Sequence, residues 1–358
     1  MRNDGYADMA PQLCETIILA RESQRPVYIS AGGSKRHIIG RQCDAQVLDV
    51  STHRGIIDYQ PAELVITARS GTTLEELQNA LELQGQTLSF EPPRFDGRAT
   101  LGGTLACNLS GPARPWSGSI RDMVLGVKLI NGRGELLNFG GKVMKNVAGY
   151  DLSRLQAGAL GTLGVLSEIS MKVLPRSEHT LYLSYEMTAQ QAVQTMNQRA
   201  GEPKPLTGAF WLEGRLYLRL AGTASAVEHT ASLWGGDRSA VQDSMWQDLR
   251  DMSLPFFAGP DPLWRFSLKG TTPSEPALEP GLIDWCGAQR WVRGNHDLRS
   301  MQNIANAGQG HFTLFRGGDR CGETRSPLNA LEQRLQQRLK HAFDPDGILN
   351  PGRLYSWL

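Results

Sequence analysis

Apolar and polar residues alternate at two spacings over the first 90 residues, one typical of helices and one typical of strands. Apolar side chains recur at helical spacing over 9–25, which predicts an amphipathic helix that Pro26 ends. The T-x-x-E pattern at Thr72 predicts the start of a further helix, which ends at Gly85. Runs rich in Val, Ile and Leu predict strands at 27–30, 47–52 and 64–71. The order of these elements indicates a domain of mixed α and β structure.

Strand patterns continue beyond the glycine-rich middle of this region. Two apolar runs flank the sequence Asn-Gly-Arg-Gly at 131–134, which predicts a β-hairpin. Residues 151–159 are predicted to be helical, and a glycine-containing turn at 161–164 leads into a strand at 165–175. We therefore expect strands and short helices up to Pro175.

The pattern changes after Pro175. Helical runs at 188–200 and 224–234 alternate with shorter strand-like runs, and a proline-rich connection follows at 255–281. We interpret this part as a separate α+β domain with its own core. The chain then ends in an amphipathic helix and a turn-rich tail. One face of that helix carries Leu328, Leu331, Leu335 and Leu339.

Composition excludes several classes of protein. The formal net charge is +1, which gives no reason to expect nucleic acid or an anionic membrane as a partner. The cysteines at 14, 43, 107, 286 and 321 are too scattered for a zinc or iron–sulfur ligand run and are typical of reduced cytosolic thiols. The polar start of the chain does not resemble a signal peptide, and no apolar run is long enough to span a bilayer. We expect a cytoplasmic protein.

The stretch 99–122, ATLGGTLACNLSGPARPWSGSIRD, is the most distinctive in the chain. Glycines let backbone approach a ligand closely, and successive free N–H groups form an anion-binding nest. Side chains that could add donors are Asn108, Ser110, Arg114, Ser117 and Arg121. A turn-rich surface loop is an equal interpretation of this stretch alone. AGGSKR at 31–36 and GTLG at 161–164 are two further candidates. Three such turns together suit a long ligand with a central pyrophosphate, such as FAD.

Other motifs are absent from the sequence. We find no G-x-G-x-x-G after a strand, no P-loop, no G-x-S-x-G elbow and no closely spaced histidine pair. A metal site is therefore not predicted. His311, within AGQGHFTLFRGGD, is the histidine with the most suggestive surroundings.

Four segments carry the recognisable motifs of the chain: AGGSK after a strand, ATLGGTLACNLSG, DLSRLQAGALGTLGVLSEISMKVLP and FDPDGILNPGRLY. In this order they resemble the FAD-linked oxidases of the vanillyl-alcohol oxidase/p-cresol methylhydroxylase (PCMH) superfamily. CNLSGPARPWSGSIRD, GGKVMKNVAGYDLSRL, LIDWCGAQRW and LWRFSLKG resemble more closely the FAD-binding E-type subunits of bacterial glycolate oxidase complexes.

The resemblance implies an α+β fold in three parts. A two-part PCMH-type FAD-binding domain would span 1–175, with subdomains at about 1–88 and 89–175. A smaller α+β cap domain would span 176–324, and the helix and tail at 325–358 would pack back on the FAD domain.

The resemblance also implies a set of cofactor-binding residues. Those of the first loop are Ser30, Ala31, Gly32, Gly33, Ser34 and Lys35, and those of the second are Gly102, Gly103, Thr104, Ala106, Cys107, Asn108 and Gly111. Ser117, Gly118 and Arg121 would lie near the flavin or its ribityl chain, Gly161, Gly164 and Val165 at the adenosine end, and Asn350 would return from the tail. Some relatives attach flavin through a histidine immediately after the Gly-Gly of the first loop. Ser34 stands there, so we expect noncovalent FAD.

The sequence departs from family members that oxidise 2-hydroxy acids. They carry a histidine pair around an Asp-Gly-Asn segment, whereas this chain has only His311 there, and Arg265, Arg290 and Arg316 as candidate carboxylate partners. Salt bridges within the protein are an alternative role for each arginine. The leading hypothesis is an FAD-binding subunit that acts with a sister flavoprotein and an iron–sulfur subunit to oxidise glycolate to glyoxylate. The alternatives are a self-sufficient 2-hydroxy acid dehydrogenase and a flavin-free scaffold.

Overall fold

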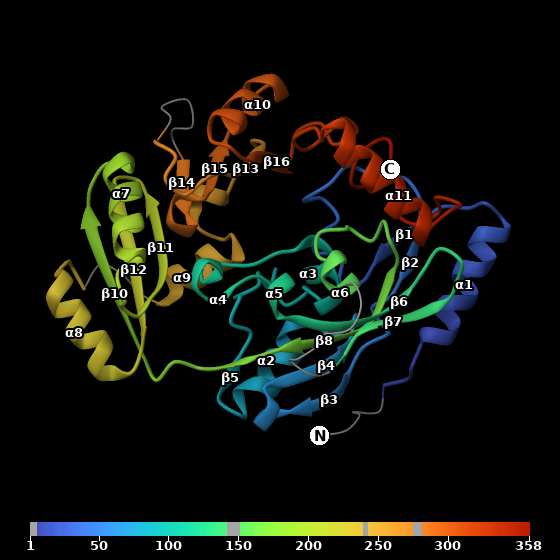
Figure 1. The fold of residues 1–358 in the computed structure, drawn as a ribbon, viewed down its shortest axis with the longest axis horizontal. Helices are drawn as coiled ribbons and strands as arrows, with labels where there is room; N and C mark the ends of the chain where they lie inside the picture. Colours follow the sequence, from blue (N-terminus) through green and yellow to red (C-terminus); the bar gives the residue numbers. More distant parts are fainter. Residues whose placement is uncertain (1–5, 142–150, 239–242, 275–280) are drawn as a thin grey trace.

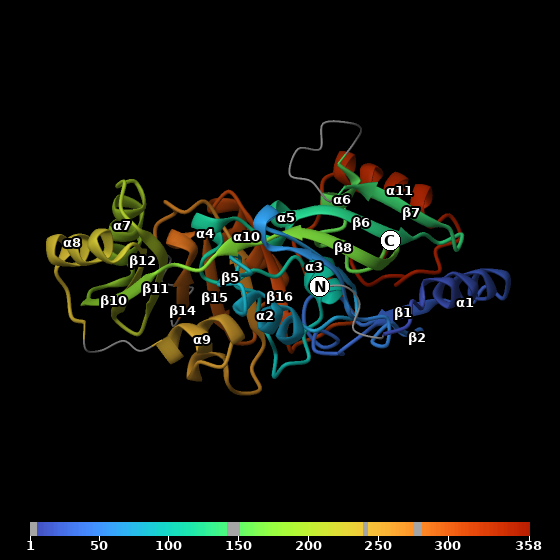
Figure 2. The same ribbon diagram turned by 90° about the horizontal axis from the view of Figure 1, so that it is seen from below.

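The chain folds around two antiparallel sheets, one built by its first 175 residues and one by 179–316 (Figure 1). We describe a computed structural model, which defines residues 6–141, 151–238, 243–274 and 281–358. The motif residues 142–150 therefore lie outside the described part. Figure 2 shows helices α1 and α8 at opposite ends of the molecule.

The first sheet has the strand order β3-β4-β8-β6-β7. These strands are β3 (Ile56–Gln60), β4 (Val65–Arg69), β8 (Val165–Lys172), β6 (Val124–Ile130) and β7 (Leu136–Gly140). Helices α2 (Leu74–Glu82) and α3 (Leu101–Cys107) share its core cluster, in which Ile66, Leu77 and Leu101 are fully buried. Short elements complete this part: β5 (Gln86–Thr87), α4 (Arg114–Ser117), α5 (Ile120–Met123), α6 (Leu152–Leu155) and β9 (Leu174–Pro175).

A small parallel pair stands beside the first sheet. Strand β1 (Val27–Ser30) pairs with β2 (Gln46–Asp49), and helix α1 (Ala10–Glu22) packs on them through Leu13 and Ile17. The tail returns to the same place, because Leu349 bridges to Val27 and is fully buried. Residues far apart in the sequence therefore hold the start of β1 in place.

The second sheet has the strand order β10-β12-β11-β14-β15-β13-β16. Its strands are β10 (His179–Glu186), β12 (Arg215–Gly222), β11 (Leu206–Leu212), β14 (Gly281–Asp284), β15 (Gln289–Arg293), β13 (Leu263–Ser267) and β16 (His311–Arg316). Its helices are α7 (Ala189–Ala200), α8 (Ala224–Trp234), α9 (Asp243–Asp251) and α10 (Leu298–Ala307), and α11 (Ala330–Phe343) precedes the tail. Phe266 and Phe312 pack on the α10 side, whereas Trp291 and Phe315 share a core with Leu109 and Leu160 of the first part.

The predicted α+β architecture is confirmed, with local corrections. The cap of α2 is Thr73, which forms a capping box with Glu76, one residue later than predicted. The helix predicted at 151–159 is only the single turn α6. The proline-rich connection contains strand β13. We did not predict this strand, because prolines surround its apolar residues. No helix of the described residues is long and apolar enough to cross a membrane.

The leucine face of α11 differs from a typical amphipathic helix. Leu331 is 58% exposed and Leu335 is 50% exposed, whereas Lys340 and Phe343 are buried. Helix α11 therefore packs through its C-terminal end. The domain boundaries at 175 and 324 stay a prediction. The core of the second sheet is shared across them, because Ile38 and Leu354, which lie outside 176–324, belong to one of its clusters.

His53 stabilises the chain end that leads into α1. Its side chain is fully buried, its Nδ1 accepts the N–H of Met9 (3.2 Å), and its Nε2 lies 2.9 Å from the Oγ of Ser167. A neutral imidazole accepts at one nitrogen and donates at the other, whereas a protonated one only donates. Burial lowers the pKa of His53 below its ordinary value. Protonation therefore costs the Met9 hydrogen bond.

We predict that acidification destabilises the fold through His53. The unfolded His53 titrates at about pH 6.5, and the folded His53 titrates at a lower pH. Its contribution to the free energy of unfolding is therefore complete above about pH 6.5 and is lost as the pH falls from there through the lower pKa of the folded residue. Denaturant titrations at about pH 7.5 and about pH 5.5 should show a smaller loss of unfolding free energy for His53→Gln than for the wild type. The exposed His229 provides the control, and His229→Gln should keep the wild-type loss. An equal loss in wild type and His53→Gln would contradict the assignment.

Candidate functional site

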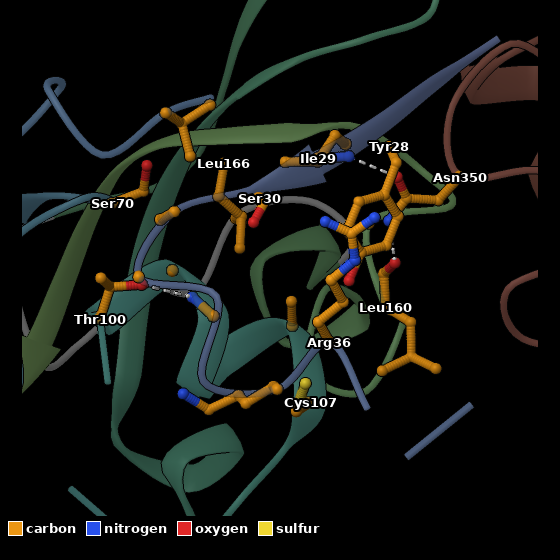
Figure 3. A pocket seen from close by; sticks show the side chains of 18 of the residues that line it. Tyr28, Ile29, Ser30, Arg36, Ser70, Thr100, Cys107, Leu160, Leu166 and Asn350 are labelled. Carbon is orange, nitrogen blue, oxygen red and sulfur yellow. Dashed lines mark hydrogen bonds between the residues drawn. The ribbon is translucent and has the colours of Figure 1, made fainter. Parts of the chain in front are cut away.

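A cavity opens between the end of β1, the start of α3, the 160–164 turn and the tail (Figure 3). About 730 Å³ of space free of protein atoms lies within its lining, and part of that space is open solvent. Figure 3 shows the loop after β1 curving past the start of α3, with Ser70 and Cys107 on different sides of the loop.

The loop at 31–35 offers unused hydrogen-bond donors. Within the described part of the chain, the backbone N–H groups of these five consecutive residues donate to no other group. The tail contacts the backbone where this loop ends: one nitrogen of Arg353, Nη2, lies 3.1 Å from the carbonyl oxygens of Lys35, Arg36 and Ile38. Successive free N–H groups in a loop can form a concave site for an anion.

The glycine-rich stretch at 99–122 offers fewer free N–H groups than we expected of an anion-binding nest. The N–H groups of Leu101 and Gly102 donate to the carbonyl oxygens of Thr72 and Ser70, so they are not free for a ligand. A Cβ on Gly102 would lie 2.6 Å from the Cβ of Ser70, and one on Gly32 would lie 1.8 Å from the Arg98 carbonyl oxygen. These glycines let separate backbone segments pack closely. Gly32 and Gly102 therefore contribute to the shape of the cavity.

Two buried polar groups in the cavity have few partners. The Lys35 side chain is 8% exposed, and its only hydrogen bond to the described residues runs to the Oγ of Ser34 (3.2 Å). Burial lowers the pKa of Lys35 to about 8, and no carboxylate of the described residues forms an ion pair with it. The Oγ of Ser70 is buried and, among the described residues, has no hydrogen-bond partner. An anionic ligand would satisfy both groups, because isolated buried polar groups are unfavourable.

Asn350 closes the cavity from the tail. Its Oδ1 accepts the N–H of Ile29 (2.7 Å), and its Nδ2 donates to the carbonyl oxygen of Leu160 (2.6 Å). Its φ of 44° lies in the left-handed region, which asparagine tolerates better than most residues. A Cβ on Gly161 would lie 2.6 Å from Nδ2 of Asn350, so the turn must approach as glycine. One amide therefore joins β1, the 160–161 turn and the tail.

Most of the predicted cofactor residues line this cavity: Ser30, Ala31, Gly32, Gly33, Ser34, Lys35, Gly102, Gly103, Ala106, Cys107, Gly161, Gly164 and Asn350. The predicted residues outside its lining are Thr104, Asn108, Gly111, Ser117, Gly118, Arg121 and Val165. Thr104 donates to the Thr100 carbonyl oxygen (2.8 Å), Ser117 donates to that of Ser89 (2.6 Å), and Val165 is fully buried in a core cluster. Arg121 is exposed.

Sequence reasoning missed other lining residues: Tyr28, Ile29, Arg36, Val50, Ser70, Thr100, Leu160, Leu166 and Arg353. Several directly adjoin predicted positions. Arg353 lies in the NPGRLY segment that carried the resemblance, so that motif could have indicated it. Ser70 carried no signal, because its role depends on the approach of Gly102.

Comparisons with known proteins agree with this geometry. A family model described as "FAD binding domain" matches residues 6–140. A solved structure of alkyldihydroxyacetonephosphate synthase aligns with a TM-score of 0.66 and 16% identity over 96% of this chain and 75% of that one, which shows a shared fold. These findings define the class: a protein with an FAD-binding domain and the fold shared with that synthase.

Two curated relatives match nearly the whole chain. Glycolate oxidase subunit GlcE of Escherichia coli (strain K12) is 45% identical over 351 residues, 98% of this chain and 99% of that protein. Glycolate oxidase subunit GlcD of Bacillus subtilis (strain 168) is 32% identical over 430 residues, 98% of this chain and 89% of that protein. The chain belongs to the family of the glycolate oxidase subunit GlcE.

We predict that Asn350→Ala destabilises the protein by about 2–4 kcal/mol, because it leaves the Ile29 N–H and the Leu160 carbonyl buried without partners. Urea denaturation measures the change. Asn303→Ala, at an exposed position of α10, is the matched control and should change stability by less than about 0.5 kcal/mol. Equal stabilities of the two variants would show that the Asn350 bridge contributes little.

Proposed function

We propose that the cavity holds FAD, with its pyrophosphate against the free N–H groups of residues 31–35 and the Lys35 ammonium. The observation that supports this proposal most strongly is a set of five consecutive N–H donors beside a buried lysine, neither of which has an anionic partner among the residues that the structure describes. The Ser70 hydroxyl offers one more donor. The other predicted residues that line the cavity contribute shape and packing around the same ligand.

FAD is held noncovalently in this proposal. Ser34 follows the Gly-Gly of the first loop, and a hydroxyl at that place does not form the histidyl link of some relatives. Acid precipitation should therefore release the flavin into the supernatant.

The chain serves a complex that oxidises glycolate to glyoxylate, as the names of the GlcE and GlcD relatives suggest. FAD, when bound, supplies an acceptor for two electrons. Among the described residues, no group of three or more His, Cys, Asp or Glu side chains could hold a metal ion. We propose a sister flavoprotein and an iron–sulfur subunit as partners, with cytoplasmic location and at most peripheral membrane contact through the complex.

We predict that Gly103→Trp abolishes flavin retention in a folded protein. An added side chain at Gly103 would start 3.2 Å from the Thr100 Oγ1 and 3.7 Å from the Lys35 Nζ, so an indole would fill the cavity. The flavin-to-protein absorbance ratio and circular dichroism measure the two properties. Gly201→Trp, at an exposed position after α7, should retain flavin. Stoichiometric flavin in folded Gly103→Trp would refute the cavity assignment.

We predict that the purified chain carries flavin whose absorbance glycolate does not bleach under anaerobic conditions until the sister subunit is added. Immediate bleaching of the chain alone would favour the self-sufficient dehydrogenase. Absence of flavin from correctly folded protein would favour the scaffold.

A further inference from the structure

Helix α11 lies at the edge of the molecule in both views (Figure 1, Figure 2). Its buried residues are Lys340 and Phe343, which belong to its last turn. Over 330–338, by contrast, no residue is buried. Most helical stability in proteins comes from tertiary packing of one face, and short isolated helices are marginal in water. The first two turns of α11 therefore lack the packing that usually stabilises such a helix.

One exposed row of α11, here called the α11 seam, has the spacing of a coiled-coil contact. It consists of Leu331, Leu335, Arg338 and Ala342, at intervals of four, three and four residues. This spacing places them on one side of the helix. All four are exposed, and the leucines are 58% and 50% exposed. The α11 seam faces away from the protein, because the buried Lys340 follows Arg338 by two residues and lies on the opposite side of the helix.

Basic side chains accompany the α11 seam. A shallow groove open to solvent runs beside it, lined by Arg334, Gln337, Arg338, His341 and Ala342. Among the described residues, neither Arg334 nor Arg338 forms an ion pair or a side-chain hydrogen bond. Glu332, the acidic residue of α11, lies outside this groove and accepts the N–H of Asn329 (2.9 Å) in the capping box. The exposed face is therefore apolar and basic.

A second copy of this chain fits the α11 seam poorly. In a parallel pair of α11 helices, Arg338 would face the Arg338 of the other copy, and in an antiparallel pair it would face Leu335. Both arrangements place guanidinium groups in the contact without a carboxylate, because the α11 seam carries none. Like charges that meet across an interface suppress the wrong partner. The α11 seam therefore favours a different chain of opposite charge.

A lipid surface also fits the α11 seam poorly. Helices that lie on membranes bury a continuous apolar face, which usually contains Trp, Phe or Leu. In the α11 seam, Arg338 lies between Leu335 and Ala342 in the same row. Insertion of this row would carry the guanidinium into the apolar boundary of the membrane, whereas a carboxylate of a protein partner would pair with it. A protein partner is therefore the better match.

We propose that the α11 seam docks an acidic amphipathic helix of the sister flavoprotein. Apolar side chains of that helix would cover Leu331 and Leu335, and its Asp or Glu side chains would pair with Arg334 and Arg338. The inference rests on the proposed function, which supplies the sister flavoprotein as partner. The names of the GlcE and GlcD relatives point to such a flavoprotein as a subunit of the same complex.

Isothermal titration of the full chain with the purified sister flavoprotein tests the docking site. Leu335→Glu and Arg338→Glu each place a negative charge in the α11 seam, and each should raise the Kd by about 10- to 100-fold, the effect expected of an interface hot spot. Both residues are exposed, so circular dichroism should show an unchanged fold. Leu233→Glu, at a position of α8 that is 61% exposed, is the matched control and should bind as the wild type does. Higher ionic strength should weaken wild-type binding, because it screens contacts between arginine and carboxylate.

Equal Kd values in the wild type, Leu335→Glu and Arg338→Glu would overturn the docking site and leave the proposed partner in place. No binding of the sister flavoprotein to the wild type would overturn both, and the flavin content of the same samples reports on the cofactor cavity separately. Self-association of the wild type that Arg338→Glu abolishes would assign the α11 seam to a second copy. Sedimentation with phosphatidylglycerol vesicles that Leu335→Glu abolishes would assign it to a lipid surface. Either result, like binding of the iron–sulfur subunit that depends on the α11 seam, would contradict the proposal.

Discussion

The bridge made by Asn350 is the constraint on which the cavity depends. Its side-chain amide accepts the N–H of Ile29 in β1 and donates to the Leu160 carbonyl oxygen of the 160–161 turn, and the residue is 3% exposed. These contacts fix three segments, separated by more than a hundred residues, relative to one another. The tail that carries it is fixed by a buried ion pair. Lys340 Nζ lies 2.7 Å from an Asp344 oxygen and also donates to the carbonyl oxygens of Thr162 and Leu349. The packed tail therefore forms part of the cavity wall.

The same tail determines the polarity of the cavity. Arg353 donates to the carbonyl oxygens of Lys35, Arg36 and Ile38 at the end of the first loop, and the N–H groups of 31–35 have no acceptor among the described residues. Lys35 adds a full charge in a place where burial makes an unpaired charge unfavourable. The protein thus presents a surface rich in donors to a long anionic ligand.

Local patterns predicted the parts of this structure that depend on neighbouring residues. The first loop, the glycines of α3 and the 131–134 hairpin were all recognisable, because each depends on a few consecutive residue types. Contacts between distant segments were not: Ser70 is important only because Gly102 packs on it. Strand β13 was missed because prolines surround it, and the exposed Leu331 and Leu335 show that an apolar stripe does not guarantee burial.

The arginines named as candidate carboxylate partners are Arg265, Arg290 and Arg316. Local sequence could not distinguish their roles either. Arg290 donates to backbone carbonyl oxygens, including that of Pro273 (2.7 Å), and Arg316 donates to that of Phe257, so both act within the fold. Only Arg265 has no such partner in the described residues, and pairing across β13, β15 and β16 was needed to see its neighbours.

The most direct test of this account is a crystal structure of the chain with FAD bound. It should place the pyrophosphate oxygens within hydrogen-bond distance of the N–H groups of residues 31–35, with the Lys35 ammonium beside them. A pyrophosphate located elsewhere, with those donors facing solvent, would contradict the central claim that the first loop and the tail together build the cofactor site.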